Sequence, residues 1–237
     1  YYPNVLDEDK ECRKKSIDHL MKVIQASALL KINLVTTFIG RNKNLNITDN
    51  LELAGNVWKP ILEYAESLNV KIAIENCPML FTEDEWPGGK NIAVSPAIWR
   101  ELFKRLPSEY LGLNFDPSHF IWQEMDYIRP LYEFKDKIFH VHYKDIRVDK
   151  EARNEVGVLA TPLSYMVPCI PGHGDVNWAR YISALLEIGY QGAACIEVED
   201  KSFEDNNENI ENSLKISRQY LKQFIHFPEK GRQYAKD

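Results

Sequence analysis

Four acidic or imidazole side chains stand at the ends of short apolar runs that are spread over the whole chain, namely Glu75, Asp116, His142 and Glu197. Successive residues of a strand point to opposite faces, so each run divides into two faces. In residues 71–75 the isoleucines share one face, and Ala73 and Glu75 share the other. The same alternation holds in residues 111–116, 139–144 and 195–199. The pattern predicts strands with an apolar face and a face of small residues that ends in polar ones.

The segments between these runs have apolar residues at helical spacing, as the crossovers of a parallel sheet require. The spacing predicts helices over residues 17–28, 57–68, 96–106, 178–188 and 210–224. Pro60 predicts a kink or a late start in the second helix. Strands that alternate with helices predict an α/β fold, and polar strand ends on one face predict a (β/α)8 TIM barrel. In such a barrel the chemistry takes place at the carboxyl ends of the strands.

Length, charge and cysteine usage limit the classes of function. A chain of 237 residues fits a single domain over residues 1–237, since such barrels typically have about 250. The net charge of −6 disfavours nucleic-acid partners, and no stretch is apolar enough to predict a membrane span. The four cysteines form no CxxC pair, which favours a reducing, cytoplasmic setting.

Two long segments without periodicity, residues 76–94 and 147–174, follow strands that carry candidate ligands. Loops of this length in a compact domain are usually binding loops or lids. We therefore expect both to overhang the mouth of the barrel. Trp86 and Trp122 follow ligand-bearing strands, so they are candidates for stacking on a sugar, although ordinary packing explains them equally well.

Five motifs carry a resemblance to a known family, and together they span nearly the whole chain: Lys71 to Asn76, Asn114 to His119, His140 to Asp145, Pro171 to Trp178, and Gly189 to Glu197. In this order they resemble the sugar phosphate isomerase/epimerase family, the xylose isomerase-like barrels of the AP endonuclease 2 superfamily. The resemblance implies that Glu75, Asp116, His142 and Glu197 hold one divalent metal. It also implies that Glu75 and Glu197 transfer protons and that His119 contacts the substrate.

Three carboxylates and one imidazole form a hard, mostly oxygen site, which favours Mn²⁺, with Mg²⁺, Co²⁺ or Zn²⁺ as alternatives. Lys144 either contacts the substrate or neutralises the carboxylates. His140 is expected to be structural and to pack beneath His142.

The resemblance also implies that the first one to two β/α units are absent from this chain. Residues 1–4 resemble the end of the family's second strand, residues 32–38 its third, and residues 166–170 its seventh. The first and last strands present, residues 32–38 and 194–199, would then have free edges, which favour pairing with a second copy in a homodimer. We expect the stable, active form to carry roughly 50–70 further N-terminal residues.

The expected function is a metal-dependent sugar isomerase or epimerase that acts through a cis-enediolate. One alternative is a lyase or dehydratase that acts on a keto-inositol or keto-glycoside with the same metal site. A second is a carbohydrate-binding module without turnover. An endonuclease IV-like repair hydrolase fits less well, because that resemblance requires further histidine ligands and the chain is acidic.

Overall fold

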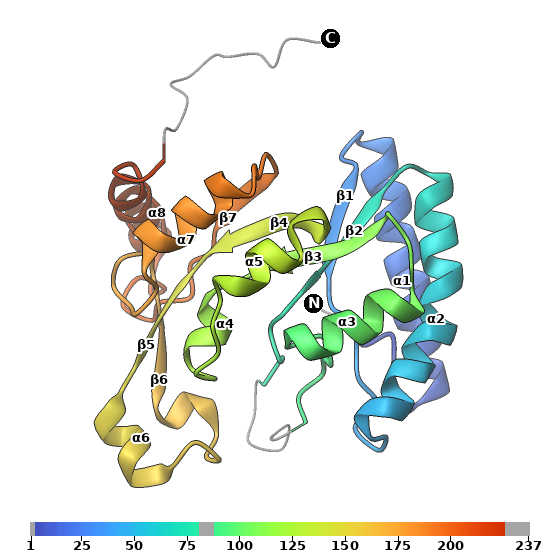
Figure 1. The fold of residues 1–237 in the computed structure, drawn as a ribbon, viewed down its shortest axis with the longest axis horizontal. Helices are drawn as coiled ribbons and strands as arrows, with labels where there is room; N and C mark the ends of the chain where they lie inside the picture. Colours follow the sequence, from blue (N-terminus) through green and yellow to red (C-terminus); the bar gives the residue numbers. More distant parts are fainter. Residues whose placement is uncertain (1–2, 81–87, 226–237) are drawn as a thin grey trace.

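A computed structural model describes residues 3–80 and 88–225. Five parallel strands form one sheet in the order β1-β2-β3-β4-β7. Their bounds are Leu34–Thr37, Lys71–Glu75, Leu111–Phe115, Ile138–Tyr143 and Ala193–Ile196. The sheet curves from β1 to β7 without closing (Figure 1). The chain thus forms a partial barrel of the α/β class, and the two strands expected to have free edges are the edge strands of this sheet.

Helices connect the strands as the apolar periodicity predicted. The longer ones are α1 Lys10–Leu29, α2 Ile47–Ser67, α3 Pro96–Arg105, α7 Trp178–Glu187 and α8 Asn207–Leu221. The short ones are α4 Ser118–Ile121, α5 Arg129–Glu133, α6 Lys150–Val156 and the 3-10 turns η2 Lys135–Lys137 and η3 Pro162–Ser164. The late start expected at Pro60 is wrong, because the side chain of Asn46 caps α2 by accepting from the N–H of Asp49. Among the described residues no helix has the length and apolarity of a membrane span.

The apolar faces of the strands pack against the helices and form the core. Ile72 and Ile74 of β2 are almost fully buried in this core, as are Leu111, Leu113 and Phe115 of β3. Large aromatic side chains from the helices complete it: Trp58, Trp99, Trp178 and Tyr181. The opposite faces of the strands therefore carry the polar residues that the alternation predicted there.

The prediction that residues 166–170 form a barrel strand is wrong. β6 (Met166–Cys169) pairs antiparallel with β5 (Asp145–Val148) in a separate two-stranded ribbon, and β7 pairs directly with β4. The ribbon leaves the sheet after β4 and carries α6 near its far end (Figure 1). Pro168 has no N–H to donate, which a two-stranded ribbon tolerates better than the middle of a sheet. Of residues 1–4, Tyr1 and Tyr2 lie outside the described residues, and Pro3 and Asn4 are not in a strand.

The buried carboxylate of Asp145 joins the ribbon to the start of α7. It accepts from the backbone N–H groups of Gly172 (2.9 Å) and Val176 (3.0 Å) and from the indole N–H of Trp178 (2.8 Å). Asp145→Ala would leave the buried donors of Val176 and Trp178 unpaired, at about 1–3 kcal/mol each, and would also remove the bond from Gly172. We expect the free energy of unfolding to fall by about 3 kcal/mol or more in urea titration. Asp18→Ala, on the exposed face of α1, should change it by less than about 1 kcal/mol.

Candidate functional site

Each of the four predicted metal ligands stands at the carboxyl end of a different strand. Glu75 is the last residue of β2, His142 lies near the end of β4, and Asp116 and Glu197 directly follow β3 and β7. Because the strands are parallel and adjacent in the order β2-β3-β4-β7, these ends share one edge of the sheet. Glu75 and Glu197 are the outer members of the set.

The structure brings the four side chains together. One ligand atom from each lies within 4.8 Å of all the others. Nδ1 of His142 is 2.9 Å from Oε2 of Glu197, 3.7 Å from Oε1 of Glu75 and 3.9 Å from Oδ2 of Asp116. The imidazole therefore sits between the three carboxylates.

The polar atoms of this group fit a divalent cation. Oδ2 of Asp116, Nδ1 of His142 and Oε2 of Glu197 are buried and have no well-aligned hydrogen-bond partner among the described residues. Buried polar atoms without partners are costly and rare. A cation at their centre would satisfy them, and a set of three carboxylates and one imidazole suits a hard or borderline divalent metal.

Contacts within this group shift the pKa values of Glu197 and His142. Burial alone would raise the pKa of Glu197, but His142 and Lys144 lower this pKa to about 2. Burial would lower the pKa of His142, but its contact with Glu197 and the nearby charge of Glu75 raise it. Glu197 is therefore an ionised carboxylate at neutral pH and is available as a ligand or as a base.

Lys144 places a buried positive charge beside the carboxylates. Only 3% of the residue is exposed, and its Nζ lies 2.7 Å from Oε2 of Glu199 and 3.6 Å from Oε2 of Glu197. Burial lowers the pKa of Lys144, but the carboxylates around it, Asp116 first among them, raise the pKa well above its ordinary value. The structure thus supports charge neutralisation, one of the two roles expected for Lys144, and a contact with substrate stays a prediction.

Asn114 supports His142, a predicted metal ligand, from behind. Its Nδ2 lies 3.0 Å from Nε2 of His142, and its Oδ1 lies 2.8 Å from Nδ1 of His140. Burial and the neighbouring His142 lower the pKa of His140 to about 4, so His140 is a neutral, structural residue beneath His142. For Nδ1 of His142 to bind a cation, Nε2 must keep its proton and needs an acceptor. A half-turn of the Asn114 amide supplies its oxygen for this purpose.

Loss of this support should weaken metal binding without removing a ligand. We expect Asn114→Ala to lower the affinity for Mn²⁺ by about 10–100-fold, the range for outer partners of metal-bound histidines. Competition with a chromophoric chelator measures this affinity. Asn209→Ala, at the start of α8, where the side chain donates to Asp205, is the matched control, and equal affinities of the two variants would exclude the supporting role.

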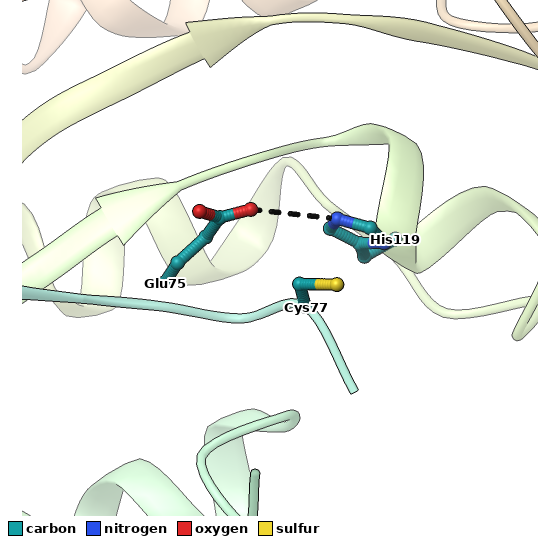
Figure 2. Close-up of side chains that lie close together, drawn as sticks. All are labelled: Glu75, Cys77 and His119. Atoms are coloured by element: carbon teal, nitrogen blue, oxygen red, sulfur yellow. Dashed lines mark ion pairs between the residues drawn. The ribbon is translucent and has the colours of Figure 1, made fainter. Parts of the chain in front are cut away.

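A second group of side chains borders the four predicted metal ligands. Figure 2 shows Glu75, Cys77 and His119 pointing toward one another, and Nε2 of His119 lies 3.6 Å from Oε1 of Glu75 and 3.4 Å from Oδ2 of Asp116. This nitrogen is buried and has no hydrogen-bond partner among the described residues. Burial lowers the pKa of His119, but Cys77 and Asp116 together raise it well above its ordinary value. His119 therefore lies beside the predicted metal ligands, and its contact with a substrate stays a prediction.

Of the two tryptophans predicted to stack on a sugar, Trp122 and Trp86, the structure describes Trp122. Trp122 is 6% exposed and lines a cavity beside the site. Trp86 lies outside the described residues.

The sequence analysis assigned no role to four residues that contact the candidate site residues, namely Asn76, Cys77, Asn114 and Glu199. The strand alternation could have indicated Asn114 and Glu199, which share a face with Asp116 and Glu197.

Asn76 fixes the backbone of a predicted ligand. Its Nδ2 donates to the carbonyl of Asp116 (2.9 Å), and its Oδ1 accepts from the N–H of Asp116 (2.8 Å). The ends of β2 and β3 are thereby locked side by side.

With this geometry in view, comparison with known proteins gives the family. Residues 1–222 match the model of the xylose isomerase-like TIM barrel family. The chain belongs to this family. The membership agrees with the resemblance that the five motifs carry.

Two curated relatives illustrate the range of the matches. The uncharacterized protein YfiH of Bacillus subtilis is 30% identical over 180 residues, which cover 71% of this chain and 51% of YfiH. An inosose dehydratase of Lactiplantibacillus plantarum is 27% identical over 117 residues, which cover 48% of this chain and 38% of the dehydratase. The chain thus spans about half, or less, of the length of these relatives.

Solved structures share the fold at lower identity. The IOLI protein with a bound zinc atom has a TM-score of 0.69 and 18% identity, and the match covers 94% of this chain and 76% of that one. A D-tagatose 3-epimerase-like protein has a TM-score of 0.65 and 21% identity, with 93% and 74% covered. These likenesses confirm the barrel architecture.

Proposed function

We propose that the protein is a divalent-metal-dependent sugar isomerase or epimerase that acts on a ketose or keto-sugar derivative. The observation that carries the proposal is the convergence of Glu75, Asp116, His142 and Glu197, with ligand atoms within 4.8 Å of one another. The two glutamates come from the outer strands of the set, β2 and β7, so they approach the centre from different sides. Epimerisation needs such a pair of carboxylates on either side of a substrate.

A bound divalent metal, Mn²⁺ by preference, would supply Lewis-acid polarisation of the substrate's carbonyl and adjacent hydroxyl oxygens. The residues of this chain carry the proton. Glu197, ionised at neutral pH, removes a proton from the carbon next to the carbonyl, and Glu75 returns one to the enediolate. Return to the same carbon from the other face gives an epimer, and return to the neighbouring carbon gives an aldose. Such proton transfer typically contributes about 10²–10⁴-fold to the rate.

Three further residues would orient the sugar. We assign His119 and Lys144 to its oxygen atoms, because His119 offers an unpaired buried nitrogen beside Glu75 and Lys144 lies beside Glu197. Trp122 would contact the part of the substrate that extends beyond the metal ligands.

A lyase or dehydratase is the second candidate. Several relatives, including the one from Lactiplantibacillus plantarum, are named inosose dehydratases. Their chemistry can begin with the same step, removal of a proton next to a carbonyl, after which a leaving group departs from the adjacent carbon. The same residues would serve both reactions, and only the product distinguishes them.

The test is incubation of the metal-loaded protein in D₂O with a panel of ketoses, keto-inositols and keto-glycosides. We expect deuterium uptake at the carbon next to the carbonyl in at least one of them, monitored by NMR, and the product identifies epimerase, isomerase or dehydratase. Chelated protein is the control. Equal exchange with and without metal would contradict the proposal.

A further inference from the structure

A group of three possible ligands adjoins the four predicted metal ligands, which we call the first site. Glu75, Cys77 and His119 each offer a ligand atom within 4.8 Å of the other two, and Figure 2 shows the three side chains pointing toward one another. This group shares Glu75 with the first site and no other residue. Cys77 and His119 thus lie beside the first site without belonging to its set of ligands.

Neighbouring segments hold the three side chains in place. Glu75 ends β2 and Cys77 follows two residues later, and both side chains point from the chain toward His119 in α4 (Figure 2). Asn91 fixes the backbone of this segment, because its Nδ2 donates to the carbonyls of Glu75 (2.9 Å) and Cys77 (2.7 Å). Sγ of Cys77 accepts from the N–H of Met79 (3.4 Å). The group is therefore positioned before any ligand binds.

The imidazole of His119 needs a partner inside this group. His119 is only 6% exposed, and its Nε2 has no hydrogen-bond partner among the described residues. The oxygen atoms beside it, Oδ2 of Asp116 at 3.4 Å and Oε1 of Glu75 at 3.6 Å, are beyond the usual length of an N–H···O bond. A buried nitrogen without a partner is costly. A cation between His119, Glu75 and Cys77 would satisfy it, and the partly exposed Cys77 gives the cation a path from solvent.

The spacing and the ligand types fit Zn²⁺. Tetrahedral zinc with bonds of about 2.0–2.3 Å places its ligand atoms about 3.3–3.7 Å apart. Oε1 of Glu75 and Nε2 of His119 are already 3.6 Å apart, and the other two pairs lie within 4.8 Å, so small side-chain rotations would close the site. Thiolate and imidazole ligands favour Zn²⁺ over Mn²⁺, whereas the carboxylates of the first site suit Mn²⁺. The two sites therefore differ in the metal that they prefer.

The charges of the region favour two cations. Four carboxylates belong to the first site or pair with Lys144 beside it, namely Glu75, Asp116, Glu197 and Glu199. Lys144 supplies one positive charge, and a thiolate at Cys77 would add a negative one. One divalent cation would leave this partly buried cluster negative, whereas two would neutralise it. Uncompensated buried charge is costly, so the second cation is favoured.

We propose that Glu75, Cys77 and His119 bind a second divalent cation, Zn²⁺, with Glu75 as the ligand shared with the first site. Cys77 binds as the thiolate, and its proton passes to solvent. Three protein ligands leave a fourth position open for water or a substrate oxygen, as in catalytic zinc sites. With a sugar bound, this position would take the oxygen atom that we assign to His119. The second site goes beyond the proposed function and does not depend on it, because Zn²⁺ can bind whatever reaction the protein catalyses.

The test detects the thiolate ligand directly, without turnover. Metal-free protein is titrated with Co²⁺, because a cobalt ion bound to a thiolate has a charge-transfer absorption in the near ultraviolet. We expect this absorption to saturate in the wild type and to disappear when excess Zn²⁺ displaces the cobalt. His142→Ala, which weakens the first site, should keep the absorption, since Glu75, Cys77 and His119 remain.

A matched pair of cysteine variants identifies the sulfur. Cys77→Ser should abolish the absorption and weaken zinc binding at the second site by more than about 100-fold, beyond the loss found when only an outer partner of a ligand is removed. Cys12→Ser, at an exposed position in the first turn of α1, should leave both unchanged. Metal analysis after gel filtration at saturating Zn²⁺ should give two zinc ions per chain in the wild type and Cys12→Ser, but one in Cys77→Ser. Both variants should bind Mn²⁺ as the wild type does, which shows that they fold.

Three results would overturn the second site: no charge-transfer absorption in the wild type, equal absorption in Cys77→Ser, or equal zinc content in Cys77→Ser and the wild type. The last result would mean that the additional zinc lies elsewhere on the surface. The titrations contain no substrate, so their outcome is independent of the proton-transfer chemistry. Deuterium exchange in a protein without the absorption overturns only the second site. Two zinc ions without exchange in any ketose, keto-inositol or keto-glycoside overturn only the proposed function.

Discussion

Replacing Glu197 with glutamine is expected to lower substrate proton exchange by about 100-fold or more, because the amide keeps the shape of the side chain but cannot accept a proton. Metal binding should persist with reduced affinity, since Glu75, Asp116 and His142 remain. Deuterium incorporation measured at saturating Mn²⁺ separates the two effects. Loss of the base lowers the rate of proton exchange even when every metal site is filled.

The matched control is Glu211→Gln, the same chemical change on the exposed face of α8, where Glu211 pairs with Lys215. This variant should exchange protons at the wild-type rate. Near-normal turnover by metal-free Glu197→Gln would rule out the mechanism, because neither the base nor the Lewis acid would then be needed.

The four predicted ligands could be found from the sequence because strand geometry obeys a strict rule. A residue two positions from an inward-facing neighbour also faces inward, so Ala73 and Glu75 fall on one side and the isoleucines on the other. Parallel strands then bring their carboxyl ends to one edge, whatever the length of the connecting helices. That is why residues as distant as Glu75 and Glu197 could be assigned to one centre, and the structure places them there.

The ribbon of β5 and β6 could not be predicted from such a rule. Residues 166–170 have a strand-like composition, but the choice between pairing with the sheet and pairing with residues 145–148 depends on contacts that no local pattern encodes. Tyr143 of β4 pairs with Ile196 of β7, so that position in the sheet is already taken. The assignment of β6 to the barrel failed for this reason.

The cavity beside the site escaped prediction because its walls are loops. Arg41 and Pro78 closely follow strand ends, and Asn91 lies further along the segment after β2, where the alternation no longer constrains direction. Their contacts depend on how separate loops meet, and only the structure shows that Arg41, Asn91 and Trp122 line one cavity.

His142→Ala is expected to abolish most metal binding. The ring nitrogen Nδ1 sits between the three carboxylates, and its loss leaves three anions without the donor that joins them. Affinity should fall by more than about 100-fold, the upper value found when only an outer partner of a ligand is removed. Metal analysis after gel filtration, together with chelator competition, measures the loss.

Thermal melting also measures the loss of metal binding in His142→Ala, and it needs no substrate. At a metal concentration of 100 times the dissociation constant, binding stabilises the folded state by about 2.7 kcal/mol, and a 100-fold weaker site gains only about 0.4 kcal/mol at that concentration. For a chain of this size each kcal/mol shifts Tm by about 2–4 °C. Mn²⁺ should therefore raise the Tm of the wild type, and of His19→Ala on the exposed face of α1, by about 5–11 °C, but that of His142→Ala by only about 1–2 °C. An equal rise in all three proteins would mean that the imidazole is not a ligand, and the cation would then have to be held by the carboxylates alone.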